Sequence, residues 1–498
     1  MKHMTRESRQ WQEPAGVSRR GLITAVGSAL FLAGCAKPSD RSVASTPTTS
    51  AESQRGTTVS SLLATSPFLI AHRGSGDNWP EHTMAAYEGA INSGAGAIEV
   101  SVCATQDGVL VCHHDTNTLR MTGVDLDIAA TDYGRLSLLK NDARSWIGPG
   151  VGLEPIPRLK DVLDRFAGSH VIFIEDKQGT NTGPLLDLMD SYPDATEHFV
   201  WKQTAAGSAY EQASSRGYRT WGYFVDNTDD QFSRFAPNFD LVGIYHGASD
   251  QEIEDLVAFG KPVICWEIHT RWMRERVLAL GVTGLMCSNY PYVAAAAASA
   301  MRDTFGDGVR ASGDLPWVLG LKYQPEFLTG ERALRMSHDT SAGYLMGSLG
   351  PMPAEAAGIN FELRWPNGLP GRHGAAGVCF GLADDQPYRA GIAGPTGGYQ
   401  LLLRASGAVE LYRRDPGVPE GTEADTLLVS FASAVPAPGE WTTLRIVSSP
   451  QEITVKRDGQ PDWSASVPDS TYRGGYLGLL KGYKDPVPVD FRSVGVVV

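Results

Sequence analysis

The chain has 498 residues, and its 43 Lys and Arg against 56 Asp and Glu give a formal net charge of −13. An acidic protein gains nothing from its overall field on a polyanion, so we expect no nucleic-acid partner. The shares of hydrophobic residues (42%) and charged residues (20%) exclude both a disordered chain and a bundle of membrane-spanning helices. The length is sufficient for two or three domains.

The first 35 residues have the features of an export signal. Arg19 and Arg20 precede an apolar stretch, Leu22 to Ala33, which is followed by Gly34 and Cys35. The stretch is too short to cross a bilayer as a helix. The segment resembles a twin-arginine signal that ends in the lipobox of bacterial lipoproteins. This resemblance implies a lipid on Cys35 and export to the outer face of the bacterial cell membrane. The alternative is a buried or interfacial helix that ends in Cys.

Beyond Cys35 the pattern predicts a tether, an α/β domain, a linker and an all-β domain. Residues 36–66 are rich in Ser, Thr, Ala and Pro, which is typical of a flexible tether. From 67 to 303, short apolar runs alternate with amphipathic stretches, and their number suits a (β/α)8 TIM barrel. Residues 304–314 are the expected linker. In 315–498, short alternating runs separated by Gly, Pro and Asp predict an antiparallel β-sandwich.

The expected elements follow in chain order. The barrel strand candidates are Phe68-Ala71, Ala97-Val102, Val109-His113, Val171-Glu175, Phe199-Lys202, Thr220-Phe224, Leu241-Ile244, Val263-Glu267 and Gly284-Cys287. The expected helices include Thr83–Ser93, Leu159–Arg165, Asp250–Phe259 and a closing helix over Ala294–Met301. The sandwich strand candidates include Asn360-Leu363, Tyr399-Leu403, Val409-Tyr412, Thr443-Val447 and Ile453-Lys456.

Two cysteines flank a hairpin signal. Asp107-Gly108 is typical of a two-residue turn, and such a turn would place Cys103 opposite Cys112. A cross-strand disulfide is therefore conceivable. Two buried thiols are favoured, because a twin-arginine substrate usually folds before export and a fold that depends on disulfides would be unusual.

Polar residues end several of the expected barrel strands, which is where a barrel builds its site. His72 and Arg73 end the first strand, and His114 follows the hairpin. Glu99 and Ser101 lie two residues apart on the second strand, as do Glu175 and Lys177 at the end of a later one, so each pair shares a face. Two histidines can act as acid and base, carboxylates from two strands can hold a hard divalent cation, and Arg73 and Lys177 can neutralise an anionic substrate.

Residues 67–298 resemble the glycerophosphodiester phosphodiesterase family. Many short motifs occur in the family's order and spacing. They are Ile70-Ala71-His72-Arg73-Gly74, Pro80-Glu81-His82-Thr83, Ala97-Ile98-Glu99-Val100, Thr105-Gln106-Asp107-Gly108, His114-Asp115, Ile156-Pro157-Arg158-Leu159, Ile174-Glu175-Asp176-Lys177, Cys265-Trp266 and Gly281-Val282-Thr283-Gly284.

The resemblance implies a TIM-barrel hydrolase of glycerophosphodiesters that needs a divalent metal ion, Ca²⁺ more than Mg²⁺. It implies acid–base work for His72 and His114 and metal binding by Glu99 and Glu175. Arg73 and Lys177 would bind the phosphate, and Trp266 would wall the glycerol. For a glycerol ester the attacking group would be the neighbouring hydroxyl of the substrate, giving a cyclic phosphate that water then opens. His114 is our candidate for the acid.

Two positions depart from the family pattern. Ser101 stands where the family usually has Asp, which removes one metal ligand and one negative charge. A hydroxyl, or a water held by Ser101, could fill the position with weaker affinity. His82 stands where the family usually has Asn, and we expect an altered loop contact there.

Each candidate site residue could instead have a purely structural role. The histidines could be satisfied core residues, the two glutamates and Lys177 could form salt bridges at the barrel mouth, and Trp266 could be core. We expect Glu81 to fix the loop after the first strand and His113 to be structural. The second function considered is a catalytically impaired barrel that serves as a surface polymer-binding lipoprotein, which Ser101 favours. A third keeps catalysis but on a phosphoinositide or sphingolipid-type ester.

The end of the chain, from Tyr472-Arg473-Gly474-Gly475 to Val489-Asp490-Phe491, resembles concanavalin-like (laminin-G-like) sandwiches. The resemblance implies carbohydrate binding over 315–498. The aromatic residues that could stack on sugar are Trp365, Trp441, Trp463 and Tyr399, and each could instead be core. With a lipid anchor, these features favour glycerol-phosphate teichoic acid or deacylated phospholipid headgroups as substrate, and cell-wall carbohydrate as a partner.

Overall fold

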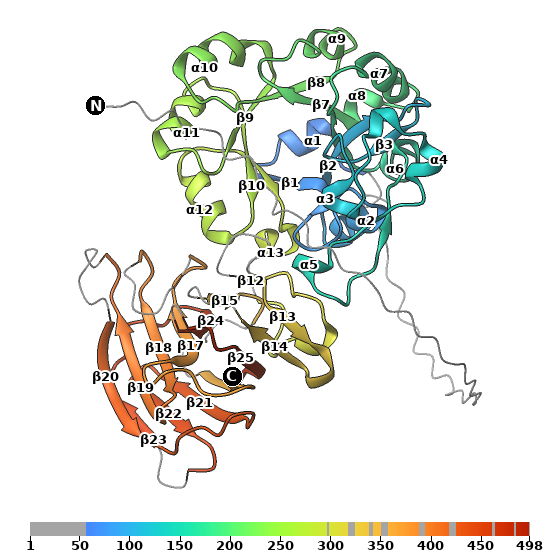
Figure 1. Cartoon of the computed structure of the whole chain (residues 1–498). Helices are drawn as coiled ribbons and strands as arrows, with labels where there is room; N and C mark the ends of the chain where they lie inside the picture. Colours follow the sequence, from blue (N-terminus) through green and yellow to red (C-terminus); the bar gives the residue numbers. More distant parts are fainter. Residues whose placement is uncertain are drawn as a thin grey trace, which may run out of the picture. The chain divides into compact units, whose positions relative to one another are not determined.

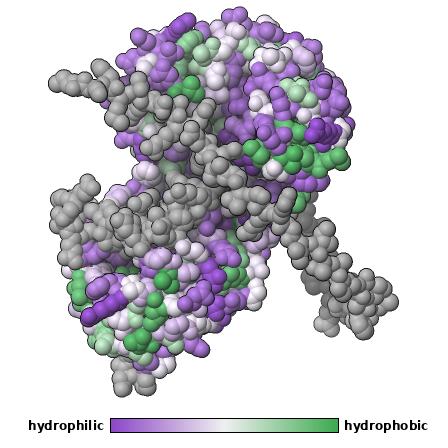
Figure 2. Space-filling view, viewed as in Figure 1, coloured by the Kyte–Doolittle hydropathy of each residue, from purple (hydrophilic) through white to green (hydrophobic). Residues whose placement is uncertain are grey.

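The computed structural model describes residues 56–295, 298–316, 324–337, 342–349, 357–386, 388, 394–417, 425–460, 464–482 and 485–497. The expected signal with Cys35, most of the expected tether, and Trp463 lie outside these residues. Within them, no helix is long and apolar enough to cross a membrane. Hydrophilic and intermediate residues cover most of the coloured surface in Figure 2, and hydrophobic residues form separate groups.

Eight parallel strands form a closed barrel with helices outside it, as the sequence predicts (Figure 1). The first strand pairs with both the last and the second, which closes the sheet. In sheet order the strands are β1 (Phe68–Ala71), β2 (Ala97–Ala104), β6 (Val171–Asp176), β7 (Phe199–Thr204), β8 (Arg219–Tyr223), β9 (Leu241–Tyr245), β10 (Val263–Ile268) and β11 (Gly284–Cys287). Strand β3 (Leu110–Cys112) adds antiparallel to β2, and β4 (Lys140–Asn141) pairs with β5 (Glu154–Pro155).

Several helices of this part begin at polar caps and bury an apolar face. Thr83 caps the helix that follows it, and Ser249 forms a capping box with Glu252. The helices are α1 (Val59–Leu63), α2 (Met84–Asn92), α3 (Leu119–Thr122), α4 (Tyr133–Leu136), α5 (Arg144–Ile147), α6 (Leu159–Phe166), α7 (Thr182–Asp190), α8 (Ala195–His198), α9 (Tyr210–Ser215), α10 (Asp229–Phe235), α11 (Asp250–Val257), α12 (Arg271–Ala279) and α13 (Tyr290–Ala294).

The prediction of a closing helix over Ala294–Met301 is wrong. The last helix of the barrel ends at Ala294, and Ala300 forms an isolated parallel bridge with Leu349. High helix propensity in an alanine run is a weak preference that tertiary pairing overrides.

The inward-facing side chains change from apolar to polar along the barrel axis. Alternate residues of a strand share a face, so each strand sends every second side chain inward. At the amino ends of the strands these are Phe68, Ile70, Ala97, Val171, Phe173, Val200, Trp221, Leu241, Ile264 and Met286, which form one core. Continuing by twos toward the carboxyl ends, the series becomes His72, Glu99, Ser101, Glu175, Lys202, Tyr223, Trp266 and Ser288. The barrel interior is therefore filled by apolar side chains at the amino ends of the strands and lined by polar side chains at their carboxyl ends.

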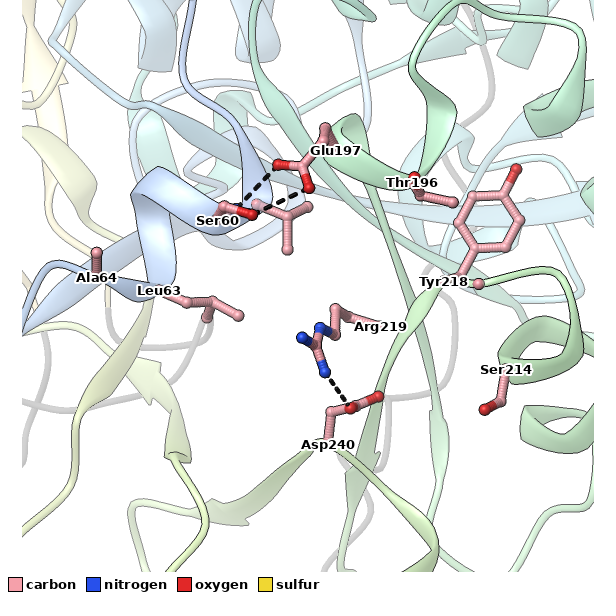
Figure 3. A pocket seen from close by; sticks show the side chains of 11 residues that line it. Ser60, Leu63, Ala64, Thr196, Glu197, Ser214, Tyr218, Arg219 and Asp240 are labelled. Carbon is pink, nitrogen blue, oxygen red and sulfur yellow. Dashed lines mark hydrogen bonds and ion pairs between the residues drawn. The ribbon is translucent and has the colours of Figure 1, made fainter.

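Helix α1 lies at the amino-terminal end of the barrel, where Val59 and Leu62 join this core. The prediction of a flexible tether over 36–66 is therefore wrong for the last residues of that range. Two apolar side chains spaced to share one helix face are enough to hold α1 against the barrel. Beside α1 lies a pocket of about 640 Å³ (Figure 3). Ser60 bonds to Glu197 on one side, and Arg219 pairs with Asp240 on the other. Glu197, Arg219 and Asp240 lie at or just before the first residues of β7, β8 and β9, so the pocket is at the opposite end of the barrel from the polar layer.

The cysteines are thiols, as favoured, but the expected register is wrong. Cys103 lies opposite Val111, and Cys112 lies opposite Val102. The loop is longer than a two-residue turn, because Thr105 and Val109 bond to each other across it. All five cysteines in the described residues are free and buried.

The C-terminal part is an antiparallel β-sandwich, as predicted. Its two seven-stranded sheets enclose an apolar core. One sheet has the order β12 (Asp314–Pro316), β15 (Ala342–Met346), β24 (Tyr476–Lys481), β17 (Ala375–Leu382), β18 (Gly398–Arg404), β19 (Ala408–Arg414) and β20 (Asp425–Ala432). The other has the order β13 (Glu326–Leu328), β14 (Ala333–Met336), β25 (Val489–Val497), β16 (Ala357–Arg364), β21 (Thr442–Ser448), β22 (Ile453–Arg457) and β23 (Ser464–Val467).

Two details of the sandwich differ from expectation. The expected linker over 304–314 is part of this fold, because Phe305 is buried in its core and Asp303 accepts a hydrogen bond from Val494. Among the expected sugar-stacking rings, Trp365 and Tyr399 are buried core residues. The guanidinium groups of Arg364 and Arg492 lie 4.5 and 4.0 Å from the ring centre of Trp441.

Candidate active site

The chain turns sharply at the end of β1 and presents two functional side chains. His72, Arg73 and Gly74 form a single 3₁₀ turn in which Arg73 has a φ of 53° and Gly74 a φ of 75°. A Cβ at Gly74 would lie 2.8 Å from Cβ of Ala86, so glycine lets the turn approach α2. The backbone N–H of Arg73 donates to Oε2 of Glu99 at 2.9 Å and thereby joins the turn to β2.

The two predicted histidines are each held at Nδ1. Nδ1 of His72 lies 2.8 Å from Oγ of Ser288, and Nδ1 of His114 lies 2.7 Å from Oδ1 of Asp115. Burial, followed by the charge of Arg73, lowers the pKa of each imidazole to about 4. Both rings are therefore near the same guanidinium and neutral at pH 7. A neutral imidazole held at one nitrogen is arranged to exchange a proton at the other.

The two predicted metal ligands converge on a lysine. Nζ of Lys202 lies 2.7 Å from Oε1 of Glu99 and 2.8 Å from Oε2 of Glu175. Burial alone would raise the pKa of both carboxyls, but Lys202 outweighs it. The pKa of Glu99 is held well below its usual range and that of Glu175 at about 2. Since β6 lies between β2 and β7 in the sheet, the pair between Lys202 and Glu99 crosses the barrel interior.

Arg73 sits in a network of acidic side chains. Its Nη1 contacts both carboxylate oxygens of Glu81 at 3.1 and 3.3 Å, and its Nη2 lies 3.5 Å from Oε1 of Glu267. Glu81 also pairs with Arg120, which donates to Asp115. As expected, Glu81 fixes the loop after β1, and through Arg120 it is linked to the carboxylate that holds His114.

The other predicted residues complete this end of the barrel. Nζ of Lys177 lies 3.3 Å from Oε1 of Glu175, which also accepts a hydrogen bond from the hydroxyl of Tyr223 at 2.7 Å. The ring of Trp266 packs at 5.2 Å from that of Tyr223 and remains half-buried. His113 is buried, with Nδ1 2.8 Å from a backbone carbonyl, as expected of a structural residue.

The residues present do not fit a divalent cation. Calcium takes six to eight oxygen ligands and magnesium six. Here Ser101 donates its hydroxyl to Oε1 of Glu99 at 3.1 Å, and the Lys202 ammonium already contacts both carboxylates. Among the described residues, no group of three His, Cys, Asp or Glu side chains is arranged to hold a metal ion. The predicted ligands Glu99, Glu175 and Ser101 therefore meet, but around an ammonium group.

Sequence reasoning missed Lys202, Tyr223, Glu267 and Ser288. A signal was present for the first two: Lys202 follows buried Val200 by two residues, and Tyr223 likewise follows Trp221. Period-two alternation could therefore have placed both in the barrel interior. Nothing local indicates that Ser288 reaches His72, because that contact joins β11 to β1 across 216 positions of the chain.

The barrel part of the chain is similar to known proteins. Residues 72–207 match the sequence model of the Glycerophosphoryl diester phosphodiesterase family. A glycerophosphodiester phosphodiesterase of Caldanaerobacter subterraneus is 36% identical over 228 residues, which cover 44% of this chain and 92% of that protein. One of Bacillus altitudinis is 32% identical over 148 residues, covering 29% of this chain and 59% of that protein.

Among solved structures, this chain is similar to a phosphodiesterase of Oleispira antarctica in complex with the product sn-glycerol-3-phosphate. The TM-score is 0.42 and the identity 21%, over 46% of this chain and 96% of that chain. The match to nearly the whole Caldanaerobacter protein, at its level of identity, is the finding that decides the family. The chain belongs to the glycerophosphoryl diester phosphodiesterase family of enzymes.

Proposed function

We propose that this chain hydrolyses glycerophosphodiesters by acid–base catalysis with His72 and His114. The observation that carries the proposal is the pair of neutral imidazoles, each held at Nδ1 by a fixed oxygen and both near Arg73 at the carboxyl ends of the strands. Two positioned proton carriers are what the displacement at phosphorus needs, one for the attacking hydroxyl and one for the leaving alkoxide.

His72 is the better base, because a carboxylate oxygen of Glu267 lies 3.8 Å from its Nδ1 and stabilises the positive charge that the ring gains with the proton. His114 is more exposed and serves as the acid. An entering phosphodiester brings the negative charge that favours its protonated form. The guanidinium of Arg73 and the ammonium of Lys177 are the cations available to the phosphate, and they stabilise charge that grows in the transition state.

The finer predictions concern cofactor, substrate source and location. Calcium as the cofactor stays a prediction, and the position of the Lys202 ammonium between the two glutamates argues against a calcium ion there. Glycerol-phosphate teichoic acid and deacylated phospholipid headgroups share the glycerol phosphodiester that this site would cut. A lipid on Cys35 would place the enzyme on the outer face of the cell membrane, and the arginine pair and apolar stretch before Cys35 support this. Carbohydrate binding by the sandwich rests on the resemblance of its closing segment.

The test is hydrolysis of glycerophosphocholine and of poly(glycerol phosphate) by the purified full chain. His72→Ala and His114→Ala are each expected to lose activity by about 10²- to 10⁴-fold. His170→Ala is the matched control, because His170 precedes β6 at the opposite end of the barrel. Unchanged turnover in His72→Ala would refute the assignment. A wild type inactive on both substrates would favour the polymer-binding role.

A further inference from the structure

The ammonium group of Lys202 lies where the acidic strand ends of the barrel converge. It contacts Glu99 at 2.7 Å and Glu175 at 2.8 Å, through one oxygen of each carboxylate. All three residues are buried, with exposed fractions of 0% for Glu99, 4% for Glu175 and 6% for Lys202. An unpaired charge at such depth is strongly unfavourable, so each of these groups depends on the others.

The charges of this cluster balance without a further ion. Glu99 and Glu175 carry two negative charges, and Lys202 and Lys177 carry two positive ones within contact distance of them. The neighbouring Ser101 adds no charge and donates its hydroxyl to the oxygen of Glu99 that Lys202 contacts. A divalent cation placed between the two carboxylates would add two positive charges beside the ammonium, and like charges at that range repel strongly.

Lys202 is also enclosed from the side. Its Nζ lies 5.5 Å from the ring centre of Trp221 and 5.4 Å from that of Tyr223, and cations are attracted to ring faces at this range. The Tyr223 hydroxyl in turn donates to Oε1 of Glu175. Turning the ammonium away would break two ion pairs and both ring contacts, so the carboxylates are not free to turn toward another cation.

We propose that Lys202 takes the place of a divalent cation between Glu99 and Glu175, and that catalysis in this barrel needs no bound metal ion. The statement about catalysis rests on the proposed function; the statement about the cation does not. Lys202 is a positioning residue: it acts through the two carboxylates, one of which accepts the backbone N–H of Arg73 and so orients the turn that carries His72.

The experiment measures metal binding and activity separately on the full chain. Calcium and manganese are titrated calorimetrically into the protein after treatment with EDTA. Hydrolysis of glycerophosphocholine is followed in EDTA and in excess calcium or magnesium. For the wild type we expect no binding heat, and rates that differ by less than about twofold between EDTA and metal.

Lys202→Met keeps the length of the side chain and removes its charge. The variant is expected to bind one calcium ion per chain. Its rate in EDTA should fall by about 10²-fold and recover at least about tenfold with calcium. A purely structural role for Lys202 would not produce recovery by a metal. Lys177→Met is the matched control: it leaves the ammonium between the carboxylates and should gain no calcium site.

One calcium ion bound per wild-type chain would overturn the proposal, and so would wild-type activity that EDTA abolishes and calcium restores. If Lys202→Met does not fold, as judged by circular dichroism, the wild-type titration decides alone. A wild type that binds no metal and hydrolyses nothing in any condition would refute the proposed function and support the replacement of the cation by Lys202.

Discussion

The ion pair between His269 and Asp77 predicts a specific dependence of stability on pH. Nδ1 of His269 lies 2.7 Å from Oδ2 of Asp77, and its Nε2 lies 3.3 Å from Oε2 of Glu267. Burial alone would lower the pKa of this imidazole, but the two carboxylates outweigh it and raise the pKa from 6.5 to about 10. The folded chain therefore keeps a proton on His269 over a range of pH in which the unfolded chain releases it.

The sign and size of the effect follow from this difference. The stabilisation is complete below about pH 6.5 and is lost as the pH rises through about 10, because the folded state binds the additional proton between these values. At about 1.4 kcal/mol for each pH unit, the full shift corresponds to about 4–5 kcal/mol. One fifth of the imidazole is exposed, and screening by water reduces the value to about 2–3 kcal/mol.

The assay is urea unfolding of the full chain, followed by tryptophan fluorescence at about pH 6 and about pH 9. The wild-type barrel should lose free energy of unfolding between the two conditions. His269→Gln should be less stable than the wild type near pH 6 and should approach it near pH 9. His170→Gln is the control: burial lowers the pKa of His170 in the folded chain, which gives a pH dependence of the opposite sign, so this variant should keep the loss of stability toward pH 9. A His269→Gln variant with the wild-type pH dependence would refute the reasoning.

The remaining predictions concern stability and the acid side of the activity profile. Lys202→Met should lower the free energy of unfolding of the barrel by about 3–5 kcal/mol, because it leaves two buried carboxylates without their shared cation; a loss below about 1 kcal/mol in urea would contradict the ion pairs. Asp490→Ala should destabilise the sandwich by a similar amount, since Asp490 is fully buried between two arginines. An unfolding temperature that changes as little as for an exposed substitution would contradict this. Gly243→Ala should cost about 1–3 kcal/mol, because its Cβ would lie 2.4 Å from the Trp221 indole. Activity should fall only as the pH approaches about 4, where His72 gains its proton and can no longer act as a base; a midpoint near its ordinary value of 6.5 would contradict the burial argument.

Much of the barrel could be predicted because its signals are local. Short apolar runs alternating with amphipathic stretches indicate parallel strands and covering helices. Strand direction then brings polar residues at the carboxyl ends together, which is why His72, Glu99 and Glu175 could be assigned to one site. Such inferences need only the chain's own periodicity and the geometry of a strand.

What the local pattern could not supply was the partner of each side chain. The contact between Lys202 and Glu99 spans 103 positions, and it exists because the strand order places β7 next but one to β2, with only β6 between them. The register of Cys103 and the burial of Tyr399 likewise depend on a loop length and on the second sheet. The amino-acid sequence by itself determined the barrel, its polar end and the residue types available there. Only the tertiary structure decided that an ammonium group lies between the two glutamates, because pairing across a closed sheet is set by strand order and register and leaves no trace in the neighbouring residues.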